Sequence, residues 1–352
     1  MLTYVMCRHR ILTKLVAVIE QWRFRCMLKI LITDRLHDSI AEEQKVCSQY
    51  GLELIDHYCS TEDDIIQYGQ DAVGLLVSYA TITKKIIESL PNLRIVVKYG
   101  VGVDNIDIPS ATAKGVYVAN IPDYCLQEVA SFALALILMG LKQIKYFNRE
   151  MESGSWISQP KEKILYRPTI ATLGLIGFGR IARTLAEYAR PMFKEIVFYD
   201  PYYEGTPPLY CRKVDDLKEM FSTCQIISLH VPLTESSRNM IGYECIEKAN
   251  GLILVNIARA AVIVFDALVK GLDSGNVLFY GADAFWEEPP EFSDKKIMDF
   301  LTRDNVVVTP HCAWCSLESE KEVRRKATLT IAQVVNGIIP YNILNANNIS
   351  NR

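Results

Sequence analysis

The stretch TLGLIGFGRIARTLAEYAR, residues 172–190, places a glycine-rich loop between an apolar run and a segment with helical spacing. These two patterns predict a buried strand followed by an amphipathic helix. Gly177 permits a tight turn between them, Gly179 lets the backbone approach a ligand closely, and the small Ala182 allows the helix to pack against the strand. The unpaired N–H groups at the start of the helix, at Arg180 and Ile181, would bind a phosphate group.

An acidic residue follows this loop at the end of the next strand-like run. Asp200 ends EIVFYD, residues 195–200, where its carboxylate could accept hydrogen bonds from the ribose hydroxyls of a dinucleotide. The same charge would repel a 2′-phosphate by up to ~4 kcal/mol at contact distance. No arginine stands at positions 201–203 to bind such a phosphate. Loop and acid together predict a Rossmann domain that prefers NAD to NADP, although an aspartate here can also simply cap a turn.

Strand-like and helix-like segments alternate along the chain from Met27. We expect strands at residues 28–33, 51–55, 72–78, 93–98 and 115–120, and again at 170–177, 195–200, 225–231, 251–257, 277–283 and 305–311. This alternation indicates βαβ units, and therefore an α/β protein with two doubly wound, Rossmann-like domains. One helix is expected over residues 126–154, with so many apolar positions that it would be buried against its own domain and a partner subunit.

A helical pattern at residues 317–337 has no further strands to join, so we expect it to pack back on the first domain. The substrate domain would then be discontinuous, comprising residues 27–125 and 315–352, and the NAD-binding domain would comprise residues 126–314. Residues 1–26 are rich in basic residues. They resemble either a transit-like amphipathic segment or an unstructured extension, and we favour the extension.

The composition excludes several classes of protein. The 352 residues carry a net charge of -3, which does not favour nucleic acid as a partner, and no long uncharged apolar run suggests a membrane span. Ten cysteines lie at irregular positions, which is typical of a reducing cytoplasm rather than of a disulfide framework.

Three ionisable residues follow the ends of strands expected to be neighbours, where open α/β sheets bind their ligands. Arg259 lies in LILVNIARAAV, Glu288 in GADAFWEEPP and His311 in VVTPHCAW. An arginine can bind a carboxylate with its planar fork, and a histidine can transfer a proton near neutral pH. A nearby glutamate would favour the imidazolium. This combination suits the oxidation of a 2-hydroxy acid.

Six stretches of the chain are together similar to the D-isomer-specific 2-hydroxyacid dehydrogenases. They are KYGVGVDNID, GFGRIA, HVPLTESSRNMIG, VNIARAA, DAFWEEPP and TPHCAW, in the order of that family. The resemblance runs from Met27 to about Gly337 and covers a family that includes phosphoglycerate dehydrogenases, glyoxylate/hydroxypyruvate reductases, D-lactate dehydrogenases and the C-terminal-binding corepressors. It implies an NAD-dependent enzyme with an active-site cleft between its two domains.

The resemblance also implies roles for single residues. Arg259 would orient the 2-oxo acid, His311 would be the general acid/base, and Glu288 would pair with His311. The substrate would be bound by the backbone of Gly100, Val101 and Gly102, with Lys98, Tyr99 and Trp314 lining the cleft, although Trp314 could equally belong to the core. The cofactor would lie against His230, Val231, Ile257, Ala258 and Asp283. Hinges near Tyr124 and Cys315, and a homodimer formed through the helix after Cys125, are further expectations.

Other interpretations of His311 are weaker. Cys312 and Cys315 follow it, but no second cysteine or histidine cluster stands at the spacing of a metal site, so we expect no bound metal. The pair also lacks the context of a thioredoxin-like motif, and a purely structural histidine is the remaining alternative. For the whole protein, the competing function is an NAD(H)-sensing corepressor with little turnover. A formate dehydrogenase would have glutamine in place of Glu288.

The chain departs from its family after Arg259. The usual pattern has two glycines and then an Asp-Glu pair, where this chain has Ala260, Ala261, Val264 and Phe265. We expect the alanines to fit poorly wherever φ must be positive. The missing acids should remove a helix cap worth about 0.5–2 kcal/mol. Trp286 and Trp314 would favour bulkier substrates if both faced the pocket.

Overall fold

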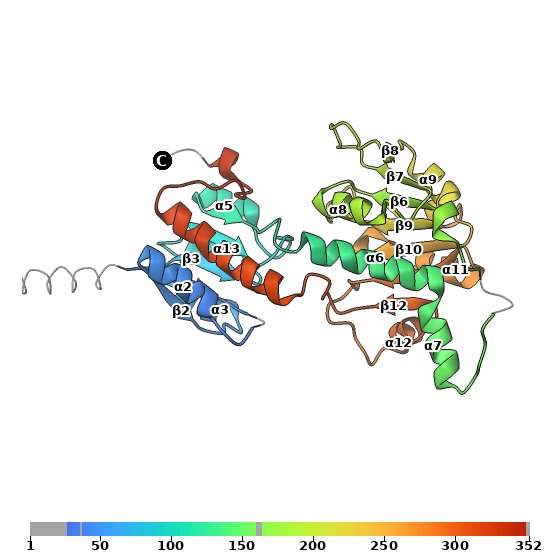
Figure 1. Cartoon of the computed structure of the whole chain (residues 1–352). Helices are drawn as coiled ribbons and strands as arrows, with labels where there is room; N and C mark the ends of the chain where they lie inside the picture. The colour runs from blue at the N-terminus through green and yellow to red at the C-terminus, as the bar shows by residue number, and fades with distance from the viewer. Residues whose placement is uncertain (1–26, 36, 160–163, 350–352) are drawn as a thin grey trace, which may run out of the picture. The chain divides into compact units, whose positions relative to one another are not determined.

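The computed structural model describes residues 27–35, 37–159 and 164–349, which form two units (Figure 1). Unit 1 comprises the described residues up to Tyr124 together with those from Leu317 onward, and unit 2 comprises Cys125–Ser316. Each unit contains one sheet whose strands are all parallel. The predicted α/β class with two Rossmann-like units is therefore confirmed. The extension at residues 1–26 lies outside the described residues.

Unit 1 has a five-stranded sheet with the order β2-β1-β3-β4-β5. Its strands are β1 (Leu28–Ile32), β2 (Leu52–Asp56), β3 (Ala72–Val77), β4 (Ile95–Lys98) and β5 (Tyr117–Ala119). Its helices are α2 (Ala41–Tyr50), α3 (Glu62–Gly69), α4 (Lys84–Ser89), α5 (Ile108–Lys114), α13 (Leu317–Val335) and the short η3 (Ala346–Asn348). β3 is buried at every position, as expected for an apolar run in a sheet covered on both faces.

Helix α13 packs against α2, β3 and β4, so the last helix completes the core of the first unit. Gly74 of β3 makes the close approach possible, because a Cβ there would lie 2.6 Å from Cγ2 of Ile331. Beside this contact, Arg324 donates hydrogen bonds to both carboxylate oxygens of Glu43, which is fully buried. Burial alone would raise the pKa of Glu43. Hydrogen bonds from His37 and Arg324 outweigh burial and hold that pKa at about 2.

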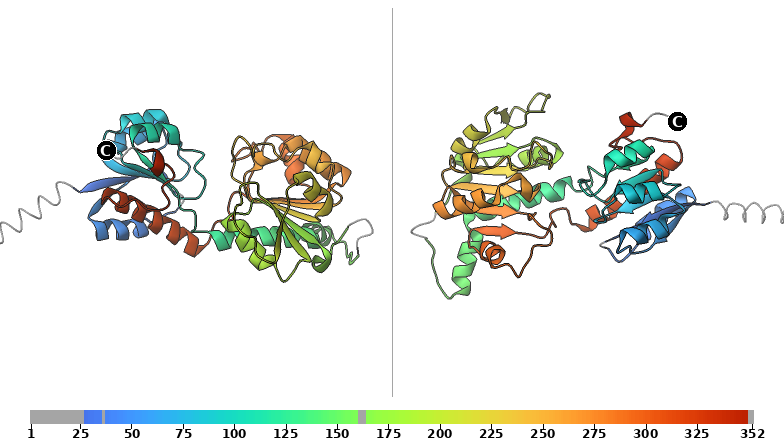
Figure 2. Two further views of the ribbon diagram at one scale, coloured as in Figure 1. Left: turned by 90° about the horizontal axis from the view of Figure 1, so that it is seen from above. Right: turned by 180° about the vertical axis from the view of Figure 1, so that it is seen from behind.

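Unit 2 has a seven-stranded sheet with the order β12-β11-β10-β9-β6-β7-β8. Its strands are β6 (Thr172–Ile176), β7 (Glu195–Tyr199), β8 (Cys211–Lys213), β9 (Ile226–Leu229), β10 (Leu252–Asn256), β11 (Val277–Ala282) and β12 (Val306–Val308). Its helices are α6 (Leu126–Lys142), α7 (Ile144–Glu152), α8 (Arg180–Ala189), α9 (Leu217–Thr223), α10 (Tyr243–Ile246), α11 (Phe265–Ser274) and α12 (Lys295–Leu301), with the 3₁₀ turns η1 (Pro168–Ile170) and η2 (Ala260–Val262). Helices cover both faces of the sheet (Figure 2).

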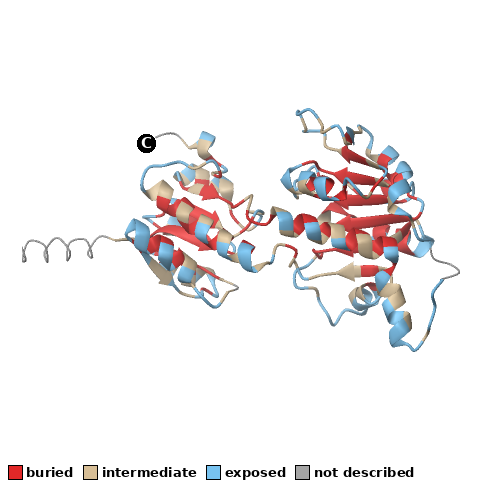
Figure 3. Ribbon diagram, viewed as in Figure 1, coloured by how far each residue is buried: buried red, intermediate tan, exposed pale blue. Residues whose placement is uncertain are grey.

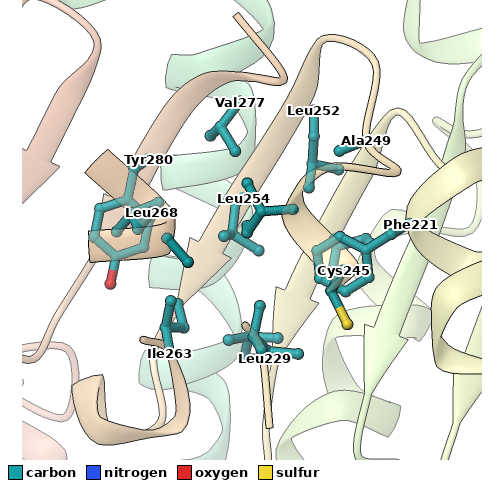
Figure 4. Packing of buried hydrophobic residues seen from close by; sticks show 14 of the residues in the cluster. Phe221, Leu229, Cys245, Ala249, Leu252, Leu254, Ile263, Leu268, Val277 and Tyr280 are labelled. Carbon is teal, nitrogen blue, oxygen red and sulfur yellow. The ribbon is translucent and has the colours of Figure 1, made fainter. Parts of the chain in front are cut away.

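The central strands of this sheet, β9 and β10, are buried at every position (Figure 3). On one face, Leu254 of β10 and Tyr280 of β11 pack with Leu268 of α11 and Phe221 of α9 (Figure 4). On the other face, α6 and α8 pack against each other, and α6 also packs against β10 and β11. The two cores hold the ends of β6, β10 and β11 in place, and these ends carry the candidate site.

The prediction of one helix over residues 126–154 was wrong. The chain forms α6 and α7 with an angle of 62° between them, and Gln143 at the break has a positive φ of 50°. Both the backbone N–H and the side-chain amide of Gln143 donate to the carbonyl of Gly140, which ends α6 in a left-handed cap. In the part of the chain that the structure describes, no single helix has the length and hydropathy of a membrane span. The bent pair α6–α7 meets that criterion only when its two helices are taken together.

Lys145 fixes the direction of α7 after the break. Its Nζ donates to the carbonyls of Arg303 (2.7 Å) and Val306 (2.6 Å), and more weakly to that of Leu301 (3.4 Å), which span the connection from α12 to β12. Burial lowers the pKa of Lys145.

Lys145→Met is therefore expected to lower the free energy of unfolding by about 2 kcal/mol, because partly buried carbonyls lose a charged donor. Urea denaturation measures this change. Lys142→Met, at the exposed end of α6, is the matched control and should cost less than about 0.5 kcal/mol. Equal costs for the two variants would contradict the prediction.

Candidate functional site

The glycine-rich loop connects β6 to α8, and its two glycines have different roles. Gly177 has a φ of +84°, and a Cβ there would lie 2.9 Å from the carbonyl oxygen of His230. Gly179 is the N-cap of α8 without a side-chain cap, and no atom lies within 4 Å of the position its Cβ would take. The first N–H groups of α8, at Arg180 and Ile181, therefore start from an uncrowded turn, as a phosphate site requires.

Asp200 follows β7 and closes the loop from the other side. One carboxylate oxygen accepts from the N–H of Phe178 (2.9 Å) and the other from the N–H of Tyr202 (2.9 Å). Asp200 thus caps this turn, as one of its two interpretations predicted. Each oxygen retains a lone pair, so these bonds still leave acceptors for ribose hydroxyls.

His230 lies at the end of β9, next to Gly177 and Val231. Burial lowers the pKa of His230 to about 3, so the ring is neutral at physiological pH. Both ring nitrogens are buried, and neither has a hydrogen-bond partner among the described residues. Buried polar groups are rarely left without partners. An uncrowded glycine loop beside these nitrogens fits a bound dinucleotide.

Arg259 projects from a turn at the end of β10, after Ile257 and Ala258. The side chain of Asn256 spans this turn, accepting from the N–H of Ala258 (2.9 Å) and donating to the carbonyl of Arg259 (3.0 Å). The guanidinium of Arg259 donates to the carbonyl of Ala258 (3.1 Å), and its charge contributes to the lowered pKa of Glu288.

The residues after Arg259 explain how the chain tolerates its departures from the family pattern. Neither Ala260 nor Ala261 has a positive φ, so the expected misfit of alanine does not arise. The expected loss of a cap is observed, because the N-cap of α11, Val264, makes no side-chain hydrogen bond; Asp266 is the acid of the first turn. The ring of Phe265 instead packs against aromatic residues of the core.

Trp286 belongs to that aromatic core. Its ring lies edge-on to Phe265 and Phe285, and its indole N–H donates to the carbonyl of Ile263 (3.0 Å). The preference for bulkier substrates required both Trp286 and Trp314 to face the pocket, and Trp286 instead packs in the core.

His311 and Glu288 form a hydrogen-bonded pair, with 2.8 Å between Nδ1 and Oε2. The other oxygen of Glu288 accepts from the N–H of Phe285 (3.1 Å). Burial alone would raise the pKa of Glu288, but the hydrogen bond and charge of His311 outweigh burial and hold that pKa below its usual value. Because Nδ1 is bonded to an ionised carboxylate, Nε2 is the nitrogen that can exchange a proton with a ligand.

The backbone of His311 is in a strained conformation, with φ at +54°. Such residues cluster at functional sites, where surrounding contacts compensate a cost of about 1–3 kcal/mol. Here the compensation comes from Asp283, whose buried carboxylate accepts from Thr309 Oγ1 (2.6 Å) and from the N–H groups of Cys312 (2.9 Å) and Ala313 (2.7 Å). The indole N–H of Trp314 donates to the carbonyl of His311 (3.0 Å). The sequence indicated Asp283 as a cofactor contact and Trp314 as either a wall of the cleft or a core residue, and it missed this support of the loop.

The remaining predicted site residues belong to unit 1. The carbonyls of Gly100 and Val101 accept from the N–H of Ile121 (2.8 Å) and the side-chain amide of Asn120 (2.7 Å). Among the described residues, no hydrogen-bond acceptor is found for the N–H groups of residues 100–102. A loop whose carbonyls are held and whose amides are available is suited to bind a carboxylate.

Lys98 and Tyr99 precede this loop and differ in their surroundings. The Nζ of Lys98 donates to Asn105 (3.1 Å) and to the carbonyl of Ser78, and it lies 5.4 Å from the ring of Tyr79. The hydroxyl of Tyr99 donates to Glu43 (3.0 Å), so it is directed into the interior of unit 1. Glu288 and His311 are thus joined by a hydrogen bond in unit 2, which also contains Arg259, whereas Lys98, Tyr99 and residues 100–102 lie in unit 1. The described residues contain no group of three or more His, Cys, Asp or Glu side chains that could hold a metal ion.

Comparisons with known proteins identify the family of the chain. Residues 134–313 match the NAD binding domain of the D-isomer specific 2-hydroxyacid dehydrogenases. The chain is 35% identical over 329 residues to D-3-phosphoglycerate dehydrogenase of Methanocaldococcus jannaschii, covering 92% of this chain and 60% of that protein. It is 37% identical over 267 residues to hydroxypyruvate reductase of Thermotoga maritima, covering 74% of this chain and 84% of that protein.

Among solved structures, D-lactate dehydrogenase from Aquifex aeolicus, complexed with NAD and lactic acid, is similar with a TM-score of 0.78 and 26% identity. The similarity covers 90% of this chain and 98% of that one. Family model, relatives and fold all lead to one conclusion. The chain belongs to the D-isomer-specific 2-hydroxyacid dehydrogenase family of NAD-dependent oxidoreductases.

Proposed function

We propose that the protein interconverts a D-2-hydroxy acid and the corresponding 2-oxo acid, with NAD(H) as the redox cofactor. The observation that carries the proposal is the 2.8 Å hydrogen bond between His311 and Glu288 on a strained loop, with Arg259 following β10, the neighbour of strand β11. A cation, an imidazole and an ionised carboxylate are the groups that carboxylate binding and proton transfer require.

Each residue has one task in this proposal. NAD(H), held by the loop at residues 177–181 and by Asp200, would supply or accept the hydride at C2 of the acid. Arg259 binds the carboxylate and the 2-oxo group with its guanidinium, which also stabilises negative charge on the oxygen. His311 gives a proton from Nε2 to that oxygen during reduction and removes it during oxidation. Glu288 keeps the imidazole oriented and favours its charged form. We assign the N–H groups of residues 100–102 to the substrate carboxylate.

The test of this function is the loss of NADH absorbance with a panel of 2-oxo acids, namely glyoxylate, pyruvate, hydroxypyruvate, phosphohydroxypyruvate and a branched oxo acid. NADPH is tested in parallel. Rapid oxidation of NADH with at least one acid would support the proposal and identify the substrate class. NADH binding without turnover on the whole panel would contradict it and would favour a sensor.

Gly177→Ala is expected to weaken NADH binding at least tenfold, because the new Cβ would displace the backbone at His230 and move the start of α8. NADH fluorescence measures the affinity. Gly275→Ala is the matched control, since Gly275 also has a positive φ (79°) but no atom within 4 Å of its Cβ position. The positive φ should cost each variant about 1 kcal/mol of stability, and the new contact should add to the cost of Gly177→Ala, but only Gly177→Ala should lose affinity.

The proposal includes a homodimer. Its support is a set of exposed apolar side chains on α7 and in the segment that follows, namely Ile144, Met151, Trp156 and Ile157. Exposed apolar side chains that lie close together in the chain favour a protein interface over open solvent. Light scattering on the purified protein measures the oligomeric state. We also propose a reducing compartment, since the cysteines in the described parts of the chain are free thiols.

A further inference from the structure

Asn256 is a fully buried polar residue at the end of β10, and the proposed chemistry gives it no task. Its side chain makes the two hydrogen bonds across the turn that carries Arg259, at 2.9 Å to the N–H of Ala258 and 3.0 Å to the carbonyl of Arg259. Its own carbonyl accepts from the N–H of Asp283 (3.1 Å). Asn256 therefore joins the Arg259 turn to the residue whose carboxylate supports the His311 loop.

The residues beyond Arg259 are held independently. The N–H groups of Asn239 and Ile241 donate to the carbonyls of Ala261 (2.9 Å) and Val262 (3.1 Å). These bonds hold residues that follow Arg259 in the sequence, whereas the side chain of Asn256 bonds to Ala258 and to Arg259 itself. The carbonyl of Arg259 accepts from the N–H of Val262 (3.2 Å) as well as from the side chain of Asn256, so main-chain bonds hold the turn after the arginine and Asn256 links the arginine back to the end of β10.

We propose that Asn256 is a positioning residue that sets the affinity for the 2-oxo acid by fixing the backbone of Arg259. The inference rests on the proposed role of Arg259 in carboxylate binding. A bidentate guanidinium–carboxylate contact tolerates only a small displacement, so a turn free to rotate weakens it. Within the described parts of the chain, Asn256 forms no hydrogen bond with the glycine-rich loop, so its replacement should affect the acid far more than the cofactor.

The experiment measures two affinities in the full-length protein. NADH binding is followed by its fluorescence, and oxamate binding to the NADH complex is followed by the quenching of that fluorescence. Asn256→Ala should raise the Kd for oxamate at least tenfold and change the Kd for NADH less than threefold. Ser228→Ala is the matched control, because Ser228 is a fully buried polar residue on the neighbouring strand β9. It should change neither affinity.

Asn256→Asp adds a signature that a merely structural role would not produce. An ionised carboxylate can accept from the N–H of Ala258 but cannot donate to the carbonyl of Arg259, whereas a protonated carboxyl can do both. The ratio of the oxamate Kd in this variant to that in the unchanged protein should therefore fall as pH falls from 8 to 5.5. The titratable residues that contact Asn256 are Arg259 and Asp283, through their backbones, and Tyr280, through its side chain, and the ratio cancels their common effects. Burial raises the pKa of Tyr280, so its hydroxyl stays neutral throughout.

Two outcomes would overturn the inference. One is an oxamate Kd that is unchanged in both Asn256 variants, and the other is an equal weakening of oxamate and NADH. Arg259→Met separates this failure from failure of the proposed function. If Arg259→Met weakens oxamate binding and the Asn256 variants do not, only the assignment of Asn256 fails. If Arg259→Met has no effect, the proposed role of Arg259 fails and the inference fails with it.

Discussion

His311→Asn is expected to lower kcat for reduction of the preferred 2-oxo acid by about 10²–10⁴-fold, since the variant has no group that can deliver the proton. Asparagine is the suitable replacement because it tolerates the positive φ of +54° at this position better than alanine does. The affinity for NADH should change little. Steady-state kinetics and NADH fluorescence measure the two effects separately, and a fall in kcat of less than tenfold would exclude His311 as the proton donor.

Glu288→Gln tests the same pair through pH. The pKa of Glu288 lies below its ordinary value of 4.5 in the folded protein, so the pair contributes stability above about pH 4.5 and loses it as pH falls further. Without the carboxylate, the imidazolium loses its counter-ion. Reduction requires the imidazolium as proton donor, so its rate falls as pH rises. In the variant this fall should occur at a lower pH than in the unchanged protein. Identical pH profiles would show that Glu288 only orients the ring.

Arg324→Leu is expected to destabilise unit 1 by roughly 3–5 kcal/mol, because it leaves the carboxylate of Glu43 buried without its counter-ion. Arg324 and Glu43 are both at least nine-tenths buried, and both oxygens of Glu43 accept from Arg324. Arg325→Leu, on the exposed side of the same helix, is the matched control and should cost less than about 0.5 kcal/mol. The described tryptophans lie in unit 2, so hydrogen exchange of unit 1 amides is the suitable measurement.

The same pair predicts a pH dependence. The pKa of Glu43 in the folded protein, about 2, lies below the ordinary 4.5. The stabilisation is therefore complete above about pH 4.5 and disappears as pH falls towards 2. Unit 1 of the unchanged protein should therefore lose stability between about pH 4.5 and 2. The stability of Arg324→Leu, which lacks the pair, should change less over the same range. Replacing both residues, as Glu43→Gln with Arg324→Leu, should restore part of the loss caused by Arg324→Leu alone. No recovery in the double variant would contradict the electrostatic explanation.

Much of this protein could be predicted from the sequence, because the informative patterns are local. A glycine such as Gly177 and the apolar strand before it lie within a few residues, so spacing alone indicated the turn and the dinucleotide site. The break at Gln143 was not predicted. No glycine or proline occupies that position, and only the cap on Gly140 and the packing of α7 reveal it.

The candidate site divides in the same way. His311, Glu288 and Arg259 were identified from motifs, and their roles remain proposals. The contacts of Asp283 with the His311 loop join residues 26 to 30 positions apart, and no pattern along the chain indicates which hydrogen bonds a carboxylate makes over that separation. Tyr99 shows the limit most clearly, because a residue expected to line the cleft directs its hydroxyl to Glu43 in the interior.

Glu43 and Arg324 lie near opposite ends of the chain, and this separation affects folding during protein synthesis. The two residues are 281 positions apart, so the ribosome releases Glu43 long before the helix that carries its counter-ion. Unit 2 comes from one continuous stretch and can complete its own core as it emerges. We therefore expect nascent chains stopped after residue 316 to contain a protease-resistant unit 2 and a protease-sensitive unit 1. The part of the protein that is translated first would be the last to fold.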